Sequence, residues 1–246
     1  MNILVGTSGW SYKEWRGSFY PPKLPADDML HYYASRFSAV EVNNSFYRIP
    51  SERVLAVWAE QVSPEFKFVM KASRRITHTN RLKDEDGSVA YFLRAVNPLG
   101  SRLGPTLFQL PPTFKKDLLR LSDFLQKLPK RWPAAIEFRH ESWLGDDVYD
   151  LLRARDVALV TADQDEAEGK GVPLTPTASW GYLRLRRAGY DAAALGRWSD
   201  QIRSQPWRQA FVFLKHEEGS PTGPAAAGEL KRILEVAGGD EDHDPS

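Results

Sequence analysis

Short apolar segments recur along the chain, separated by longer segments in which apolar residues have a helical spacing. Leu30, Tyr33, Ala34 and Phe37 follow the i, i+3, i+4, i+7 rule of an amphipathic helix. Strands that alternate with helices form parallel sheets, because parallel neighbours need a crossover connection. The predicted strands cover residues 3–8, 39–43, 67–73, 105–110, 134–139, 158–163, 181–186 and 211–216.

Eight strands and seven clear helical patterns predict a (β/α)8 barrel of the TIM type, an α/β fold. The chain has 246 residues, close to the roughly 250 of such barrels. Residues 164–179 hold two Gly and two Pro without helical periodicity, so helix six is expected to be degenerate or missing. An open doubly wound sheet would need a glycine-rich phosphate-binding turn after an early strand, and the chain has none. We predict one domain over residues 1–237 and a disordered acidic tail over 238–246.

Polar side chains end several of these strands on a single face. Alternate strand residues face opposite sides, so Val40 and Val42 share one face while Glu41 and Asn43 share the other. The carboxyl ends of barrel strands open to water and carry the active sites of TIM-type enzymes. By this parity, the residues predicted to face the mouth are Thr7, Glu41, Asn43, Lys71, Ser73, Gln109, Glu137, Arg139, Thr161, Asp163, Arg184, Arg186 and Lys215.

The charges in this set favour an anion as ligand. Its acids are Glu41, Glu137 and Asp163, whereas its bases are Lys71, Arg139, Arg184, Arg186 and Lys215. Buried charges need partners, so pairing leaves two cations in excess. Arginine suits two-pronged capture of phosphate or carboxylate. The alternative is that all these residues form a structural ion-pair network inside the barrel.

Composition removes several classes of function. The chain has no cysteine, which excludes disulfides, thiolate metal sites and cysteine nucleophiles. Its net charge of +1 gives no general argument for nucleic acid or a membrane surface, although basic pairs such as Arg74-Arg75 keep nucleic-acid processing as a weaker alternative. Neither a signal peptide nor a membrane-spanning stretch is visible. We expect a soluble cytoplasmic protein; the sequence does not give its oligomeric state.

Histidines and aromatic residues follow several strands. His78, His140 and His216 lie just beyond strands without the HxH or HExxH spacing of metal sites, so proton transfer or ligand binding is expected of them rather than metal binding. The aromatic residues could stack on a sugar or a base, or could pack the loops as a lid. Those in the loops after strands one, two and five are Trp10, Tyr12, Trp15, Phe46, Tyr47 and Trp143.

Several motifs resemble the YecE-like proteins, grouped as domain of unknown function family 72. They occur in the order in which that family has them and cover nearly the whole chain. The resemblance implies a (β/α)8-type barrel and implies no reaction, because the family is defined without an activity. The motifs are GTSGWSY at 6–12, VNNSFY at 42–47, ITH at 76–78, FQLPP at 108–112, EFRHESW at 137–143, YLR at 182–184 and KHE at 215–217.

The leading hypothesis is an enzyme that acts on a small anionic, sugar- or nucleotide-like compound by acid–base chemistry, as a hydrolase or an isomerase. A non-catalytic binding or interaction protein using the same mouth is the main alternative. No cofactor or metal is expected. The candidate catalytic residues are Glu41, Glu137, Asp163 and His140. The candidate substrate-binding residues are Thr7, Trp10, Tyr12, Asn43, Tyr47, Lys71, His78, Gln109, Arg139, Trp143, Arg184, Lys215 and His216.

Overall fold

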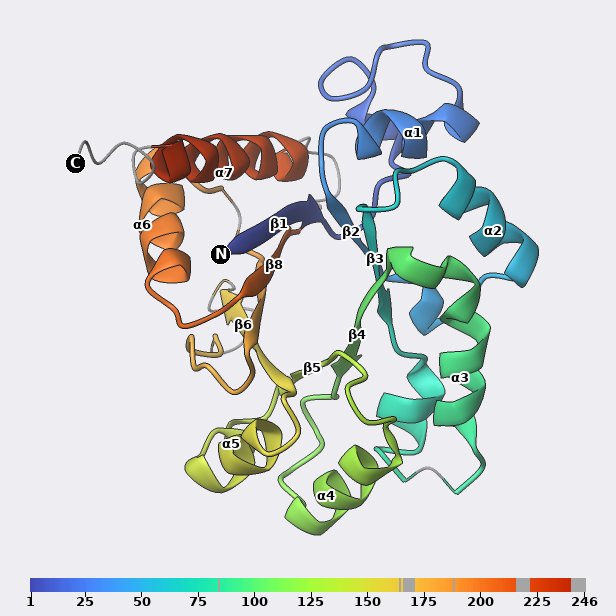
Figure 1. The fold of residues 1–246 in the computed structure, drawn as a ribbon, viewed down its shortest axis with the longest axis vertical. Helices are drawn as coiled ribbons and strands as arrows, with labels where there is room; N and C mark the ends of the chain where they lie inside the picture. The colour runs from blue at the N-terminus through green and yellow to red at the C-terminus, as the bar shows by residue number, and fades with distance from the viewer. Residues whose placement is uncertain (84, 164, 166–170, 188, 216–221, 240–246) are drawn as a thin grey trace, which may run out of the picture.

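Eight parallel strands form one nearly closed barrel with helices around it (Figure 1), which confirms the predicted TIM-type fold. The computed structural model describes residues 1–83, 85–163, 165, 171–187, 189–215 and 222–239. Around the barrel the strand order is β1-β8-β7-β6-β5-β4-β3-β2. The strands are β1 (Asn2–Thr7), β2 (Ala39–Val42), β3 (Lys67–Lys71), β4 (Leu103–Gln109), β5 (Ala134–Glu137), β6 (Ala158–Asp163), β7 (Trp180–Leu185) and β8 (Gln209–Leu214).

The helices lie outside the barrel, where their apolar faces cover the strands (Figure 1). Between β6 and β7, the residues that the structure describes contain no helix, as predicted for helix six. The last helix reaches Gly239, two residues into the segment expected to be disordered, and residues 240–246 lie outside those described. The helices are α1 (Met29–Ala34), α2 (Glu52–Glu60), α3 (Ser88–Val96), α4 (Leu118–Lys127), α5 (Asp146–Arg153), α6 (Ala192–Arg203) and α7 (Thr222–Gly239).

The apolar core has two layers, one on each side of the strands. The outer layer joins strand residues such as Val40 and Ile136 to the helices. The inner layer draws on all eight strands and combines large side chains such as Trp180 and Phe213 with small ones such as Ala135. This inner cluster fills the barrel, as in other TIM-type barrels. The described interior of the barrel is therefore filled by side chains and does not hold a ligand.

The barrel closes at a seam between β1 and β2. A Cβ atom at Gly6 would lie 1.9 Å from the Ala39 carbonyl oxygen, so only glycine allows the two strands to approach this closely. The buried Tyr33 hydroxyl of α1 bridges the seam. It accepts a hydrogen bond from the Thr7 backbone N–H at 2.7 Å and donates to the Ala39 carbonyl oxygen at 3.1 Å. A helix side chain thus supplies hydrogen bonds where the strand ladder is incomplete.

Replacing Tyr33 by Phe is expected to lower the free energy of unfolding by about 2 kcal/mol, because a buried donor and a buried acceptor both lose their partner. Urea titrations of the wild type and the variant measure this loss. Tyr32→Phe on the same helix is the control, since Tyr32 is half-buried and lies away from the seam. Equal stabilities for the two variants would contradict the bridging role of Tyr33.

No helix within the described part of the chain is both long enough and apolar enough to cross a lipid bilayer.

Candidate functional site

A cavity of about 230 Å³ opens at the carboxyl ends of the strands. Among the described residues, all strands except β6 contribute to its lining, either directly or through the residues that follow them. We call this cavity the mouth. Its lining consists of Ser8, Tyr12, Asn43, Tyr47, Lys71, Gln109, Arg139, Arg184, Arg186 and Lys215.

Arg184 forms the floor of the mouth and joins two buried carboxylates. Its Nη2 lies 2.8 Å from Oε1 of Glu41, and its Nη1 lies 2.6 Å from Oε2 of Glu137. The side chain of Arg184 is 5% exposed, and the two glutamates are 0% and 1% exposed. A planar guanidinium can donate to two carboxylates at once, which a lysine ammonium does less well.

Neutral side chains complete the partners of Glu41. Its Oε2 accepts a hydrogen bond from the Tyr182 hydroxyl at 2.7 Å. Its Oε1 accepts from the Ser8 hydroxyl at 2.9 Å and from the Asn43 amide at 3.0 Å. A buried carboxylate with this many donors is well solvated by the protein and has a fixed orientation.

A hydrogen-bonded chain connects Glu137 to the other side of the mouth. The Gln109 amide donates to Glu137 at 2.8 Å, and its carbonyl oxygen accepts from Lys71 Nζ at 2.9 Å. Lys71 Nζ also lies 4.5 Å from the centre of the Phe46 ring, a cation–π contact. Lys71 and Arg184 are therefore held in one network that spans β3, β4, β5 and β7.

Both glutamates remain ionised at neutral pH. Burial alone would raise the pKa of Glu41, but the Arg184 guanidinium and the Tyr182 hydroxyl outweigh it and lower the pKa to about 2. Burial opposes ionisation of Glu137 in the same way, and Arg184 together with Arg186 holds the pKa of Glu137 below its usual value. These two carboxylates thus act as fixed negative charges.

Lys71 of the mouth has a pKa shifted toward neutrality. Burial lowers it most, and the neighbouring Arg184 lowers it further, while Glu41 and Glu137 partly oppose them; the resulting pKa is about 8. A lysine with a pKa near 8 has an appreciable neutral fraction at physiological pH and can act as a base, whereas an ordinary surface lysine is almost fully protonated.

The lining of the mouth is rich in cationic side chains. Five of them line it, and Glu41 and Glu137 lie within ion-pair distance of Arg139, Arg184 and Arg186. Arg139 lies 3.8 Å from Glu137 and is 25% exposed. Because Glu137 already accepts from Arg184 and Gln109, Arg139 is not needed to satisfy it. The structure therefore places a water-accessible cation beside a carboxylate that has other partners.

The predicted inward orientation is wrong for Thr7, Thr161 and Asp163. Thr7 faces α1, where its hydroxyl contacts Tyr33. The next residue, Ser8, lines the mouth instead of Thr7. In β6, Ala158 and Val160 belong to the inner cluster, so Thr161 and Asp163 face outward. Asp163 pairs with Arg187 at 3.0 Å and accepts from Trp198 of α6. The carboxylate of Asp163 thus contacts side chains outside the barrel and does not face the mouth.

Of the four aromatic residues predicted to bind substrate, two lie outside the mouth. Trp143 is completely buried, stacks on Phe138 at 4.7 Å and donates to the Phe114 carbonyl oxygen at 2.6 Å. Its position contradicts its prediction as a substrate-binding residue. Trp10 lines a neighbouring pocket, whereas Tyr12 and Asn43 line both pockets, and the exposed Tyr47 lies at the mouth itself.

His78 and His140 are not among the described residues that line the mouth. His140 Nδ1 accepts from the Ser142 backbone N–H at 3.1 Å and thereby caps the short helix Glu141–Trp143. His78 contacts the Phe46 ring edge-on at 4.9 Å, and burial together with Lys71 lowers its pKa. His216 lies outside the described residues. The described residues contain no cluster of three potential metal ligands.

Two residues of the site were missed as candidates. Tyr182 has the same parity as Arg184 and lies two residues before it in β7, so the alternation that identified Arg184 could also have identified Tyr182. Ser8 has the parity opposite to that of Thr7, so it was not expected at the mouth. In the structure its hydroxyl donates to Glu41, which follows from the true orientation of β1.

Comparisons with known proteins identify relatives over nearly the whole chain. The family model "Protein of unknown function DUF72" matches residues 4–245. The Escherichia coli K12 protein YecE is 34% identical over 139 residues, which are 56% of this chain and 48% of YecE. YunF of Bacillus subtilis is 30% identical over 156 residues, 60% of this chain and 54% of YunF. These alignments span about half the length of the curated relatives.

Solved structures agree with this assignment. A DUF72 family protein from Thermotoga maritima has a TM-score of 0.81 at 26% identity, covering 96% of this chain and all of that one. A DUF72 family protein from Enterococcus faecalis has a TM-score of 0.79 at 21% identity, covering 95% of each chain. The second likeness concerns the fold alone. With the family model matched from residue 4 to residue 245, this chain belongs to the DUF72 family.

Proposed function

We propose that the mouth binds a small anionic, sugar- or nucleotide-like compound and that the protein is an enzyme acting on it. The observation that carries this proposal is the accessible Arg139 beside Glu137, a buried carboxylate that already has other donors, in a cavity lined by cationic side chains. Arginine and lysine at the rim of a partly buried cavity suit phosphate or carboxylate. Arg139 is the main contact in this proposal because it is the most accessible arginine of the described network around Glu137.

The proposed chemistry is acid–base catalysis with Lys71 as the proton carrier. Glu41 and Glu137, whose pKa values are lowered, are poor bases and serve to hold Arg184 and Lys71 in place. The pKa of Lys71, about 8, lets the amine accept a proton from a bound compound and return it. A broad screen of hydrolase, isomerase and phosphatase substrates tests this step, and the Lys71→Met variant should lose any turnover found.

Binding without catalysis is the second candidate. The observation that favours it is that both carboxylates are fully engaged in ion pairs and hydrogen bonds, so neither is available as an acid or base. A binding protein should show ligand-induced stabilisation and no turnover in the same screen.

Phosphate is expected to stabilise the protein more than chloride at equal ionic strength, by about 1.4 kcal/mol at ten times its dissociation constant. In Arg139→Met this difference should disappear, while the variant itself loses about 1 kcal/mol or less, because an ion pair this exposed contributes little. Thermal melts of both proteins in each salt measure the two effects. Arg153→Met, on the exposed surface of α5, is the control and should keep the phosphate effect. Equal shifts in phosphate and chloride for the wild type would contradict anion binding.

A further inference from the structure

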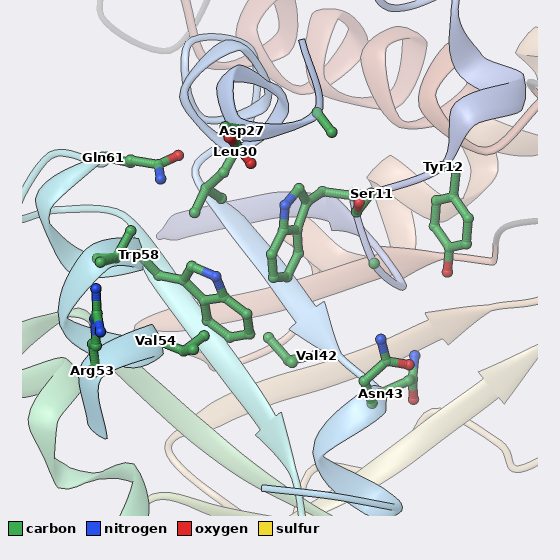
Figure 2. A pocket seen from close by; sticks show the side chains of 15 residues that line it. Ser11, Tyr12, Asp27, Leu30, Val42, Asn43, Arg53, Val54, Trp58 and Gln61 are labelled. Atoms are coloured by element: carbon green, nitrogen blue, oxygen red, sulfur yellow. The ribbon is translucent and has the colours of Figure 1, made fainter. Parts of the chain in front are cut away.

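A second pocket, which we call the groove, adjoins the mouth and is the larger of the two, at about 710 Å³. Its walls are residues 9–12, the beginning of α1, the end of β2 and one side of α2. Figure 2 shows Trp58 and Val54 of α2 on one side and Tyr12 and Asn43 on the other. Its volume falls within the range of small-molecule sites, about 300–1,000 Å³.

The α2 wall of the groove carries three apolar side chains, beside Arg53 and Gln61. Leu55 of α2 is buried in the core, whereas Val54 and Val57 are 40% and 45% exposed. With Trp58 they have the i, i+3, i+4 spacing that places side chains on one side of a helix. Single exposed apolar residues need no explanation, but three that line one pocket indicate a binding surface.

Two indole rings give the groove a rigid base. Trp10 packs edge-on against Trp58 with ring centres 4.8 Å apart, and Trp58 stacks on the buried Phe68 at 5.9 Å. Aromatic rings fixed in this way offer a large contact area to a flat ligand at little cost in conformational entropy.

The groove and the mouth share a wall. Tyr12 and Asn43 line both pockets, and each is fixed by a hydrogen bond. The Tyr12 hydroxyl donates to the Ser8 carbonyl oxygen at 2.7 Å, and the Asn43 amide donates to Glu41 at 3.0 Å. An anion in the mouth would therefore lie next to the groove, and one compound could occupy both.

We propose that the groove and the mouth are one binding site, with the anionic group in the mouth and a planar aromatic ring in the groove. The ligand class is an aryl-bearing phosphate, which includes nucleotides. The anionic half of this inference rests on the proposed function, whereas the aromatic half rests on the groove alone. Charge complementarity selects this occupant over a purely apolar one, because five cations lie across the shared wall.

The test compares three anions by isothermal titration calorimetry: inorganic phosphate, methyl phosphate and 1-naphthyl phosphate. Naphthyl phosphate is expected to bind roughly tenfold more tightly than methyl phosphate, which corresponds to about 1.4 kcal/mol. In the double variant Val54→Ser/Val57→Ser, this ratio should fall to about twofold. Leu119→Ser, which removes a side chain 80% exposed on α4, is the matched control and should keep the full ratio.

Arg139→Met separates the two halves of the site. It should weaken methyl and naphthyl phosphate by the same factor and leave their ratio unchanged. Equal affinity of the wild type for both esters would overturn the role of the groove while leaving anion binding intact. Failure of all three anions to bind would overturn the proposed function as well. Sedimentation could also show that the wild type is a dimer and that the double variant is a monomer. The groove would then be the contact with a second copy of the chain, and this result would also overturn the inference.

Discussion

Replacing Arg184 by Met is expected to lower the free energy of unfolding by about 3–5 kcal/mol, the cost of leaving buried charges without their partner. Arg184 is the shared counter-ion of Glu41 and Glu137, at 2.8 Å and 2.6 Å, and all three side chains are almost completely buried. Arg139 and Arg186 would still lie near Glu137, at 3.8 Å and 3.9 Å. The remaining donors to Glu41 are neutral, so they cannot compensate its negative charge in a medium of low polarity.

Urea unfolding at neutral pH measures this loss. The triple variant Glu41→Gln/Glu137→Gln/Arg184→Met is the sharpest control, because it removes all three charges together and should recover most of the stability. Arg139→Met, which affects the same Glu137 from the exposed side, should cost about 1 kcal/mol or less. A loss below about 1 kcal/mol for Arg184→Met would show that the two carboxylates do not depend on this arginine.

The sequence predicts the barrel and most of the mouth because charge alternates with apolar residues at the ends of β2, β5 and β7. In such strands only one parity can bury the apolar row, so the orientation of Glu41, Glu137 and Arg184 follows directly. The number of strands follows from their regular alternation with helices. Irregular backbone between β6 and β7 follows from two glycines and two prolines.

Parity fails where both faces of a strand are small or apolar. In β6, Ala158 and Val160 fit the interior as well as Leu159 does, so the sequence offers no reason to place Asp163 outside. The deciding partners, Arg187 and Trp198, come from residues that follow the next strand. In β1 the partner of Thr7 is Tyr33, 26 residues away. Contacts of this kind depend on tertiary structure and are invisible to alternation.

The aromatic residues illustrate the same limit. Trp10 and Trp143 both follow strands. Trp10 lines a pocket, whereas Trp143 is buried against Phe114 and Phe138. A tryptophan in a loop contributes to either arrangement, and only packing distinguishes them. The groove itself was not predicted, although Val54, Val57 and Trp58 are correctly spaced for one side of a helix. That spacing places the three side chains on one side of the helix. It does not show whether other parts of the protein pack against that side.

Acid is expected to destabilise the protein through Glu41 between about pH 4.5 and pH 2. The pKa of Glu41 falls to about 2 in the folded protein from the ordinary 4.5, because Arg184 and Tyr182 outweigh the effect of burial. A lowered folded-state pKa means that the unfolded chain takes up the proton first. The stabilising contribution is therefore complete above pH 4.5 and is lost as the pH falls toward 2. The shift corresponds to about 3 kcal/mol in total.

Unfolding free energies of the wild type and of Glu41→Gln, measured in urea at several pH values from 6 to 2.5, isolate this contribution. The variant should be less stable at pH 6, because Arg184 has lost one of its two charged partners, and the difference should shrink steadily below pH 4.5. Glu60→Gln, at the exposed end of α2, is the control and should stay within about 0.5 kcal/mol of the wild type at pH 6. A wild-type minus Glu41→Gln difference that is independent of pH would mean that the pKa of Glu41 is the same in the folded and the unfolded protein, and a difference that grows as the pH falls would mean that Glu41 is protonated in the folded barrel. Either result would contradict an ion pair between Glu41 and Arg184.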